Sequence, residues 1–377
     1  MTSNDSDLYV RDLGSSVEAL NGIRGLAVLQ VVLAHTHYVL NANPYATDVT
    51  KWTFINRIFE PGYLGLDVFF TLSGFLITSL LLRDLSQKKN GGHGAASVIR
   101  RFYVRRALRL LPALYVMLAL SWLWVLITND VSLLAQWRTT YSAVFYIANW
   151  ASVWNLSETN PDLGHLWSLA VEEQFYIVWP LALFLLLKFC QKHQYKLIIV
   201  AMLAVAVMMH RIGLYNEGVN WLFVYIRTDT RIDSMLIGAI FALIFRFIRL
   251  NERFISILAW GGLVGILYYK FADPPNDLFT IGFTRTAVFV GFCVLAAASG
   301  SWWINKLLSW RPLALMGRYS YGLYLYHHVI FLSVGRHMPE FSQSVRLIAA
   351  YGLSALLTFL SWRIVESRCL KLKSRFE

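Results

Sequence analysis

Charged residues and cysteines are scarce in this sequence. Only 15% of its 377 residues are charged whereas 57% are hydrophobic, a balance that excludes an ordinary soluble domain. The three cysteines, Cys190, Cys293 and Cys369, have neither metal-binding spacing nor the spacing of a disulfide framework, and we expect no metal site. The first nineteen residues are polar and lack an apolar core, so we expect no cleavable signal peptide. The sequence also lacks a repeat of fixed period.

Apolar runs of about 20 residues recur along the chain, and that length allows a helix to cross a bilayer. We therefore predict an all-α polytopic membrane protein with about ten transmembrane helices. The segment 139–154 is aromatic and only moderately apolar, and it predicts an interfacial or re-entrant helix in an outside loop. The segment 302–310 predicts a second interfacial helix, on the inside. The predicted spans are 22–40, 63–82, 108–128, 166–187, 197–215, 232–248, 254–271, 282–299, 315–335 and 345–364.

The distribution of basic residues predicts the topology. If the N-terminus is inside, the inside segments carry 24 of the 34 Lys and Arg residues and the outside segments carry 10. The positive-inside rule then places both termini in the cytoplasm, in a multi-pass protein of the cytoplasmic (inner) membrane. We expect a cytoplasmic tail at 1–19, one membrane domain at 20–366 and a basic tail at 367–377. The net charge of +12 is explained first by these basic inside loops and only second by an anionic ligand. We expect no nucleic-acid partner.

Arg24 and His35 lie on the first predicted span. They are eleven residues apart, about 20° beyond three whole turns, so both point the same way, and the rise between them is about 16 Å. Ionisable groups at that depth usually face protein or a water-filled cavity. We predict a cavity entered near Arg24 with His35 at its floor. A plain interhelical hydrogen bond for His35 and a positive-inside anchor for Arg24 are the alternatives.

Arginines crowd the entry to the third span. Arg105, Arg106 and Arg109 are related by three and four residues, so they share one side of a helix. Guanidinium groups bind phosphate with two hydrogen bonds, so the cluster suits lipid phosphates or a nucleotide-bearing donor. Positive-inside topology alone accounts for part of this pattern.

The fourth span opens with a histidine and two adjacent carboxylates. His165 and Glu172 are seven residues apart and share a face, and Glu173 follows directly. Carboxylates inside a membrane helix are expensive unless they are paired or protonated. We predict either a functional role or a structural ion pair, for which Arg227 and Arg231 are available partners.

The second span contains Asp67, Ser73 and Gly74. Small residues let helices approach closely, so packing is the better explanation for Ser73 and Gly74, although Ser73 is also a candidate pocket residue. Asp67 stands near the outer end of the helix, where it can serve a helix start, pair with an arginine or line a pocket.

The ninth span is rich in tyrosine. Ser320, Tyr324 and His327 lie on one helical face. An interfacial aromatic belt would stay at the ends of a span, whereas this run continues into it. We therefore predict a polar pocket wall.

Together these motifs resemble the membrane-bound acyltransferase family 3, whose members O-acylate sugars, lipids and some antibiotics. The family is similar in having ten spans and cytoplasmic ends. The sequence departs from the family pattern at His328 and Val329, where an aromatic residue and proline are usual, and at Arg368, where proline is usual. The resemblance runs through 20–35, 65–78, 105–112, 165–180 and 320–327.

The resemblance implies an O-acyltransferase that uses acyl-CoA as donor substrate, with no bound cofactor, and a carbohydrate or glycolipid hydroxyl as acceptor. Arg24 and the arginine cluster would hold the CoA phosphates. His35 would act as general base or receive the acyl group, and Glu172 or Glu173 would orient a histidine or the acceptor. Many relatives carry an extra SGNH hydrolase-like domain; we expect a stand-alone membrane domain here, acting alone, as a homo-oligomer or with a separate extra-cytoplasmic transferase.

A transporter or flippase for an anionic or carbohydrate solute is the alternative from another class. Ionisable residues inside the membrane and a basic mouth suit it too. Inverted internal repeats would favour it, and none is visible in the sequence. Acyl-CoA hydrolysis or acceptor-dependent CoA release by the purified protein distinguishes the two classes.

Overall fold

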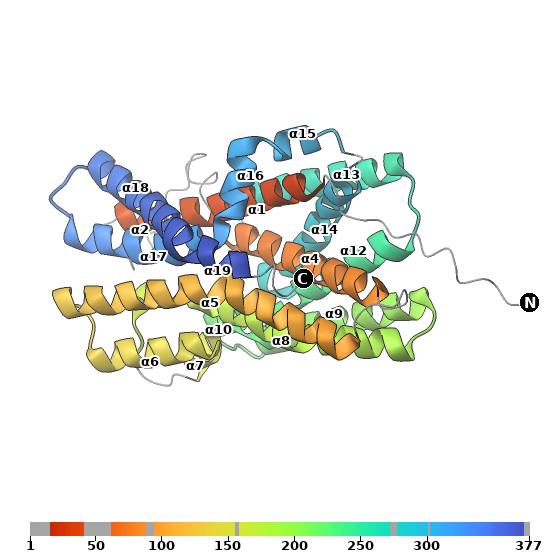
Figure 1. Ribbon diagram of the computed structural model, residues 1–377, viewed down its shortest axis with the longest axis horizontal. Coiled ribbons are helices and arrows are strands. Elements are labelled where there is room, and N and C mark those ends of the chain that lie inside the picture. The colour runs from red at the N-terminus through yellow and green to blue at the C-terminus, as the bar shows by residue number, and fades with distance from the viewer. Residues whose placement is uncertain are drawn as a thin grey trace, which may run out of the picture. The chain divides into compact units, whose positions relative to one another are not determined.

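The computed structural model describes residues 16–40, 62–87, 94–154, 158–271, 277–300 and 302–372, and within these ranges the chain forms helices and no strand (Figure 1). An all-helical chain is the expected outcome for a membrane protein, because backbone groups in lipid must form their hydrogen bonds within each segment. The all-α prediction is confirmed. Residues 1–15 of the predicted N-terminal tail and residues 373–377 of the predicted C-terminal tail lie outside the described residues.

Seven helical segments in the described part of the chain are long and apolar enough to cross a membrane. Three other predicted spans, 232–248, 254–271 and 315–335, coincide with helices that do not meet that criterion; the first of these helices has only 15 residues. The chain is thus a multi-pass helical protein, and the number ten stays a prediction. The seven segments are Val17–Leu40, Gly62–Ser86, Ala95–Thr128, Leu166–Phe189, His193–Asn216, Leu278–Ser299 and Gln343–Lys371.

The chain divides into two compact units, and the first comprises Met1–Ile23, Asp67–Ile99 and Gln174–Ala314. In it α13 packs on α14, and α12 packs on both α9 and α14. Its helices are α4 (Gly62–Gln87), the larger part of α8 (Leu166–Phe189), α9 (His193–Asn216), α10 (Trp221–Ile226), α11 (Thr228–Arg231), α12 (Asp233–Phe247), α13 (Glu252–Phe271), η4 (Leu278–Gly282), α14 (Phe283–Ser299), α15 (Asn305–Leu308) and the start of α16 (Arg311–Arg318).

Two glycines let α4 and α12 approach closely. A Cβ atom built on Gly74 would lie 1.9 Å from the carbonyl oxygen of Met235, and one built on Gly238 would lie 2.0 Å from that of Thr71. Each helix therefore offers a glycine to the backbone of the other, and no larger residue fits without moving a helix. The packing role predicted for Gly74 is confirmed, and Ser73 is buried beside it.

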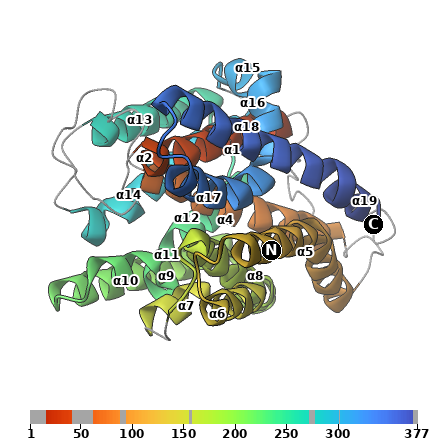
Figure 2. The same ribbon diagram turned by 90° about the vertical axis from the view of Figure 1, so that its left-hand side faces the viewer.

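The second unit comprises Arg24–Leu66, Arg100–Glu173 and Leu315–Glu377. Here α17 packs along α18, and the short helix α2 packs against both (Figure 2). Its elements are most of α1 (Val17–Ala34), α2 (His37–Leu40), most of α5 (Ala95–Thr128), α6 (Leu133–Val144), α7 (Ala148–Val153), η3 (Pro161–Leu163), the start of α8, α17 (Ser320–His337), α18 (Gln343–Ser361), η5 (Trp362–Glu366) and α19 (Ser367–Lys371).

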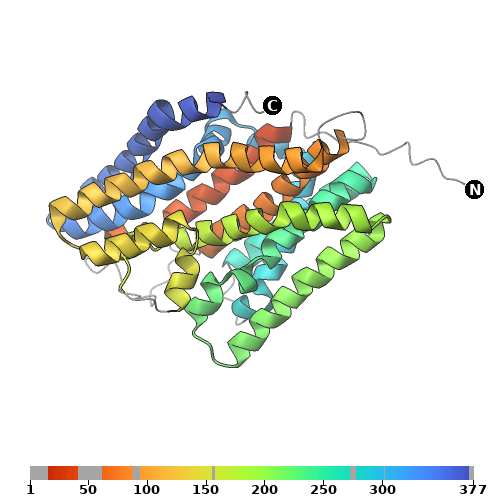
Figure 3. The ribbon, with the colours of Figure 1, turned by 60° about the horizontal axis from the view of Figure 1, so that its bottom comes forward.

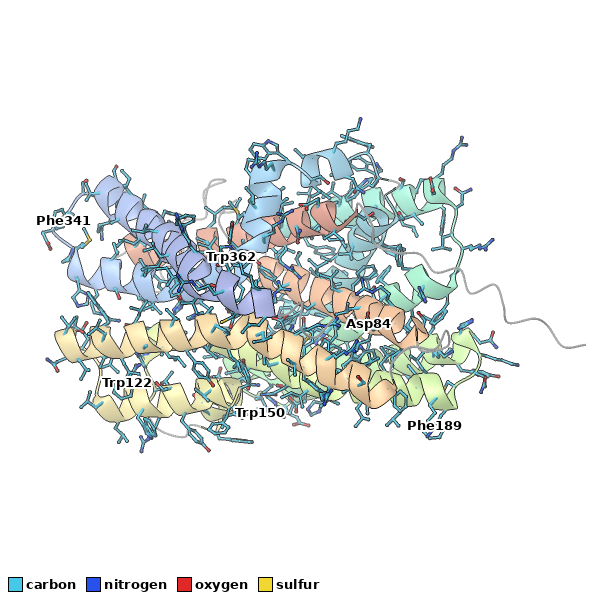
Figure 4. The ribbon with its side chains drawn as sticks, viewed as in Figure 1. Asp84, Trp122, Trp150, Phe189, Phe341 and Trp362 are labelled. Carbon is cyan, nitrogen blue, oxygen red and sulfur yellow. The ribbon has the colours of Figure 1, made fainter. Side chains whose placement is uncertain are left out.

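Helix α6 runs back along the end of α5 (Figure 3). Its polar side is buried. The indole of Trp122 on α5, labelled in Figure 4, donates a hydrogen bond to the Thr140 hydroxyl on α6. Gln136 is fully buried, whereas Trp137 and Tyr141 are more than half exposed. Apolar side chains facing outward and polar ones facing inward are typical of a helix in contact with lipid. The 139–154 segment thus forms two short helices, α6 and α7, and the 302–310 segment contains α15.

Candidate active site

His35 lies at a break in the first helical segment. The sequence predicts one helix over 22–40, but α1 ends at Ala34 and α2 begins at His37. The imidazole Nδ1 of His37 lies 2.7 Å from the carbonyl oxygen of Ala34, which has lost its helical partner at the break. The Thr36 hydroxyl is 2.6 Å from the hydroxyl of Tyr351 on α18. The turn that carries His35 is therefore held on both sides.

His35 is hydrogen-bonded to His327 of α17. The distance from Nδ1 of His35 to Nε2 of His327 is 2.9 Å, and Nδ1 of His327 lies 3.0 Å from the carbonyl oxygen of Leu323. A carbonyl oxygen only accepts, so Nδ1 of His327 carries the proton and its Nε2, in the neutral ring, has the lone pair. Nδ1 of His35 must then be the donor. In neutral His35 this leaves the lone pair on Nε2.

Two more histidines complete a cluster of four rings, which we name the histidine cluster: His35, His165, His327 and His328. The rings of His165 and His328 stack with centroids 4.6 Å apart, and the ring of His35 meets that of His328 edge-on at 5.1 Å. Nδ1 of His328 donates to the carbonyl oxygen of Asp162 over 2.8 Å, so its Nε2 has the lone pair in the neutral ring. Both ring nitrogens of His165 are buried and have no hydrogen-bond partner among the described residues.

Tyr324 connects α17 to the start of α8. Its hydroxyl donates to the carbonyl oxygen of His165 over 2.8 Å and also contacts the Ser168 hydroxyl. The Ser168 hydroxyl also donates to that carbonyl oxygen, over 3.3 Å, so the two hydroxyl groups and the carbonyl oxygen form one hydrogen-bonded group. Tyr324 therefore holds the backbone that carries His165. Ser320, on the same predicted face, is buried at the first position of α17.

The two carboxylates of α8 meet an arginine of the cluster on α5. Nε of Arg106 lies 3.0 and 2.9 Å from the two carboxylate oxygens of Glu173, and its Nη2 also bonds this carboxylate. Glu172 is farther away, at 3.7 Å from Nη2. The carboxylates are thus paired, as predicted, but with Arg106, whereas Arg231 bonds Asp67 and Arg227 bonds Asp229.

The remaining arginines of the predicted donor site differ in exposure. Arg109 is exposed on α5, while Arg105 on the same helix and Arg24 on α1 are partly exposed. The guanidinium of Arg106 is already paired with Glu173, so the four arginines predicted to bind the donor do not have equivalent surroundings.

Asp67 and Ser73 belong to the first compact unit. One carboxylate oxygen of Asp67 lies 2.6 Å from Nη2 of Arg231, and both side chains are fully buried. The guanidinium of Arg231 stacks on Phe283, with its central carbon 3.6 Å from the ring centroid. A second fully buried pair, Arg211 with Asp233, is nearby in sequence. Asp67 is thus part of a buried ion pair.

Sequence reasoning missed three residues next to the site and noted a fourth, His328, only as a departure from a family pattern. Asp162 receives the hydrogen bond from His328, and Arg336 bonds the Asp162 carboxylate. Tyr146, between α6 and α7, has a left-handed backbone with φ of 54°, which is rare for a bulky residue. Burial, and then the charge of Glu173, raise the pKa of the Tyr146 hydroxyl, so it stays a hydrogen-bond donor. Asp162 and Arg336 could have been found in the sequence, because polar residues stand out in an apolar chain. The positive φ of Tyr146 has no signal in the sequence.

The arrangement suits proton transfer. The described residues contain no group of three or more His, Cys, Asp or Glu side chains placed to hold a metal ion. A neutral imidazole with its Nδ1 proton bound and its Nε2 lone pair available is the form that serves as general base or nucleophile. His35 has that form.

Comparison with known proteins shows the family of the chain. The family described as "Acyltransferase domain" matches residues 17–364. YrhL of Bacillus subtilis is 31% identical over 370 residues, which cover 93% of this chain. The O-acetyltransferase OatA of Staphylococcus aureus is 30% identical over 371 residues, and the peptidoglycan O-acetyltransferase OatA of Listeria monocytogenes is 28% identical over 368 residues; these cover 92% and 93% of this chain.

These relatives are longer proteins. The matched regions cover 54% of YrhL, 56% of the staphylococcal OatA and 55% of the listerial OatA, so the chain spans about half the length of these relatives. No solved structure matches the chain.

Proposed function

The chain belongs to the acyltransferase family that it matches over residues 17–364, and we propose that it is an integral membrane O-acyltransferase with acyl-CoA as donor. The acyl group is acetyl, in keeping with the names of the OatA relatives. The acceptor is a hydroxyl group of a carbohydrate or a glycolipid. Because peptidoglycan stands in the name of the listerial relative, a glycan strand is the first acceptor to test.

The observation that carries this proposal is the hydrogen bond from Nδ1 of His35 to Nε2 of His327. It directs the lone pair of His35 to Nε2. As general base, Nε2 takes the proton of the acceptor hydroxyl while the oxygen attacks the thioester carbonyl, and it returns that proton to the departing CoA sulfur. In the nucleophilic variant Nε2 attacks the thioester, the C–S bond breaks and CoA leaves as thiolate; the acceptor oxygen then displaces Nε2 from the acyl group, and the hydroxyl proton goes to the thiolate. Trapping an acyl-histidine by mass spectrometry distinguishes the two routes.

The arginines have two different roles in this proposal, donor binding and a structural ion pair. Arg24, Arg105 and Arg109 bind the CoA phosphates, because guanidinium groups form charge-assisted hydrogen bonds with phosphate. Arg106 instead holds Glu173, and this pair fixes α5 against the start of α8. Glu172, which is more exposed than Glu173, is the carboxylate that orients the acceptor.

The topology belongs to the same proposal. Residues 20–366 form one ten-span domain of the inner membrane, both termini are cytoplasmic, and acyl-CoA binds from the cytoplasm. The excess of basic residues in the predicted inside segments supports this orientation. A cysteine at Ser86 should react with an impermeant thiol reagent only from the cytoplasm, and one at Ser157 only from outside. Outside labelling at Ser86 would overturn the ten-span topology.

The decisive experiment uses the purified protein in proteoliposomes with acetyl-CoA and a soluble glycan oligomer. We expect acceptor-dependent release of CoA and an acetylated oligomer in the mass spectrum. His35→Ala should lower turnover roughly 100-fold or more, the usual worth of a general base. His37→Ala is the comparison variant: that imidazole bonds the main-chain oxygen of Ala34 in the same turn but is not the ring that pairs with His327, so it should lose much less activity than His35→Ala. Near-normal turnover by His35→Ala would refute the mechanism.

The transporter alternative gains no support from the comparisons, since the matched family and the OatA names describe acyl transfer. Uptake of glycan without CoA release in the same proteoliposomes would revive it.

A further inference from the structure

Helix α17 holds one residue of the η3 turn at two points. Eight residues separate His328 from Arg336 on this helix. His328 donates from Nδ1 to the main-chain oxygen of Asp162 over 2.8 Å, and Arg336 bonds the carboxylate of the same residue, with Nη2 2.7 Å from Oδ1. The Asp162 side chain is only 4% exposed. A buried carboxylate is stable only with a partner, so Arg336 determines where Asp162 lies.

The same turn is tied to α6 by a chain of amide hydrogen bonds. The N–H of Asp162 donates to Oδ1 of Asn160 over 2.9 Å, and the side-chain amide of Asn160 donates to Gln136 over 2.7 Å. The N–H of Asn160 donates to the Thr139 hydroxyl over 2.7 Å. All of these groups are buried. The turn is therefore held from two sides, by α6 through Asn160 and by α17 through His328 and Arg336, and the bond between Arg336 and Asp162 is the contact that fixes the Asp162 side chain.

The position of this turn decides the geometry of two rings of the histidine cluster. His165 follows Asp162 by three residues and stacks on His328. The carbonyl oxygen of Asp162 keeps the proton of neutral His328 on Nδ1. If the carbonyl moves, the Nδ1 tautomer loses its preference and the stack with His165 loosens. His35 packs edge-on against His328 and would be less well positioned as a result.

We propose that Asp162 and Arg336 are positioning residues for acyl transfer, which together fix the tautomer of His328 and the orientation of the rings against which His35 packs. This inference rests on the proposed function, because it takes His35 as the reacting group. Neither residue needs to touch the substrate. Their influence should therefore fall on the chemical step and not on acyl-CoA binding.

The test compares isosteric variants in proteoliposomes with acetyl-CoA and the glycan oligomer. Asp162→Asn and Arg336→Gln should each lower kcat roughly tenfold to hundredfold, as small misplacements of catalytic groups do, with the KM for acetyl-CoA changed less than about twofold. The kcat of the double variant should be no lower than that of the slower single variant, because both substitutions remove the same contact between Arg336 and Asp162. Arg336→Lys should recover part of kcat.

Asp130→Asn is the matched control. Asp130 also contacts Arg336, at 3.4 Å, and it bonds His337, but it makes no bond to the η3 turn. Its variant should keep kcat within about twofold of the unmodified protein. An equal loss of kcat in Asp130→Asn would overturn the inference, because it would show that any substitution near the end of α17 lowers kcat by destabilising the protein.

A second readout does not depend on activity. In ¹⁵N-histidine-labelled protein the nitrogen shifts report the tautomer of each ring, and the His328 signals are assigned with His328→Phe. His328 should be in the Nδ1–H form in the unmodified protein and a mixture of tautomers in Asp162→Asn. Unchanged tautomers together with unchanged kcat in the folded variants would refute the inference while leaving the role of His35 intact. An active His35→Ala variant would refute the proposed function itself.

Discussion

The backbone of Tyr38 lies directly against Gly335. A Cβ atom on Gly335 of α17 would lie 2.1 Å from the carbonyl oxygen of Tyr38 in α2. Backbone cannot move aside as a flexible side chain can, so any larger residue at this position pushes α2 away from α17. Because His35 lies in the turn that leads into α2, the close approach also sets the distance between His35 and His327.

Gly335→Ala should therefore reduce activity and stability together. Overpacking by one methyl group in a close contact costs about 1–3 kcal/mol, and the shift of α2 should lengthen the hydrogen bond between His35 and His327. Gly352→Ala on α18 is the matched control, because a Cβ atom there meets no atom within 4 Å. Thermal unfolding in detergent and CoA release measure the two effects. Equal behaviour of the two alanine variants would contradict the packing argument.

His327 should be replaceable only by a hydrogen-bond acceptor. His327→Ala removes the group that keeps the proton of His35 on Nδ1, and kcat should fall at least roughly tenfold, since a wrong tautomer cannot act as base at Nε2. His327→Gln offers an amide oxygen to the same proton and should retain more activity than alanine. Steady-state kinetics of both variants check this order, and the reverse order would mean that His327 acts through its own ring chemistry.

Arg109 and Arg106 should respond differently to lysine. Arg109→Lys keeps the charge but loses the planar guanidinium, so the apparent KM for acyl-CoA should rise about tenfold to hundredfold with a normal folded yield. Arg106→Lys should instead lower thermal stability, because lysine cannot bond both oxygens of Glu173, whose side chain is 8% exposed. If Arg109→Lys matches the unmodified protein for acyl-CoA, the donor phosphates are held by other residues.

Asp67→Asn should destabilise the protein without changing acyl-CoA affinity in the fraction that folds. It leaves the fully buried guanidinium of Arg231 without its counter-charge, at a cost of about 3–5 kcal/mol. Asp229→Asn removes the charge from a half-exposed pair with Arg227 and should cost no more than about 1 kcal/mol. Thermal unfolding of the two variants side by side tests this contrast, and a silent Asp67→Asn would show that the ion pair adds nothing to stability.

The lengths of the apolar runs were enough to predict most of the long helices, and Glu173 stood out as a carboxylate inside such a run. Helical periodicity placed His35 and His327 on faces shared with other polar residues. Periodicity reports which way a side chain points on its own helix. It does not report which helix lies opposite. The pairing of Glu173 with Arg106 therefore could not be derived, and arginines far along the chain were equally plausible partners.

The break at His35 shows a second limit. No proline or glycine interrupts the residues between Ala34 and His37, so the sequence reads as one continuous helix. The contacts that hold the chain in this conformation come from other helices: Thr36 in the turn bonds Tyr351, and Tyr38 in α2 lies against Gly335. A tertiary contact overrides local preference here, and only the folded chain reveals it.

The hydrogen bond between His35 and His327 joins residues 292 positions apart, and this separation has a consequence for biosynthesis. At about 5–20 residues per second, a ribosome needs roughly 15–60 s to add the second histidine after the first has been made. Until His327 has been made, Nδ1 of His35 lacks the acceptor that selects its proton position. The histidine pair can thus form only after α17 has been synthesised, and a chain truncated before α17 should be unable to catalyse the reaction.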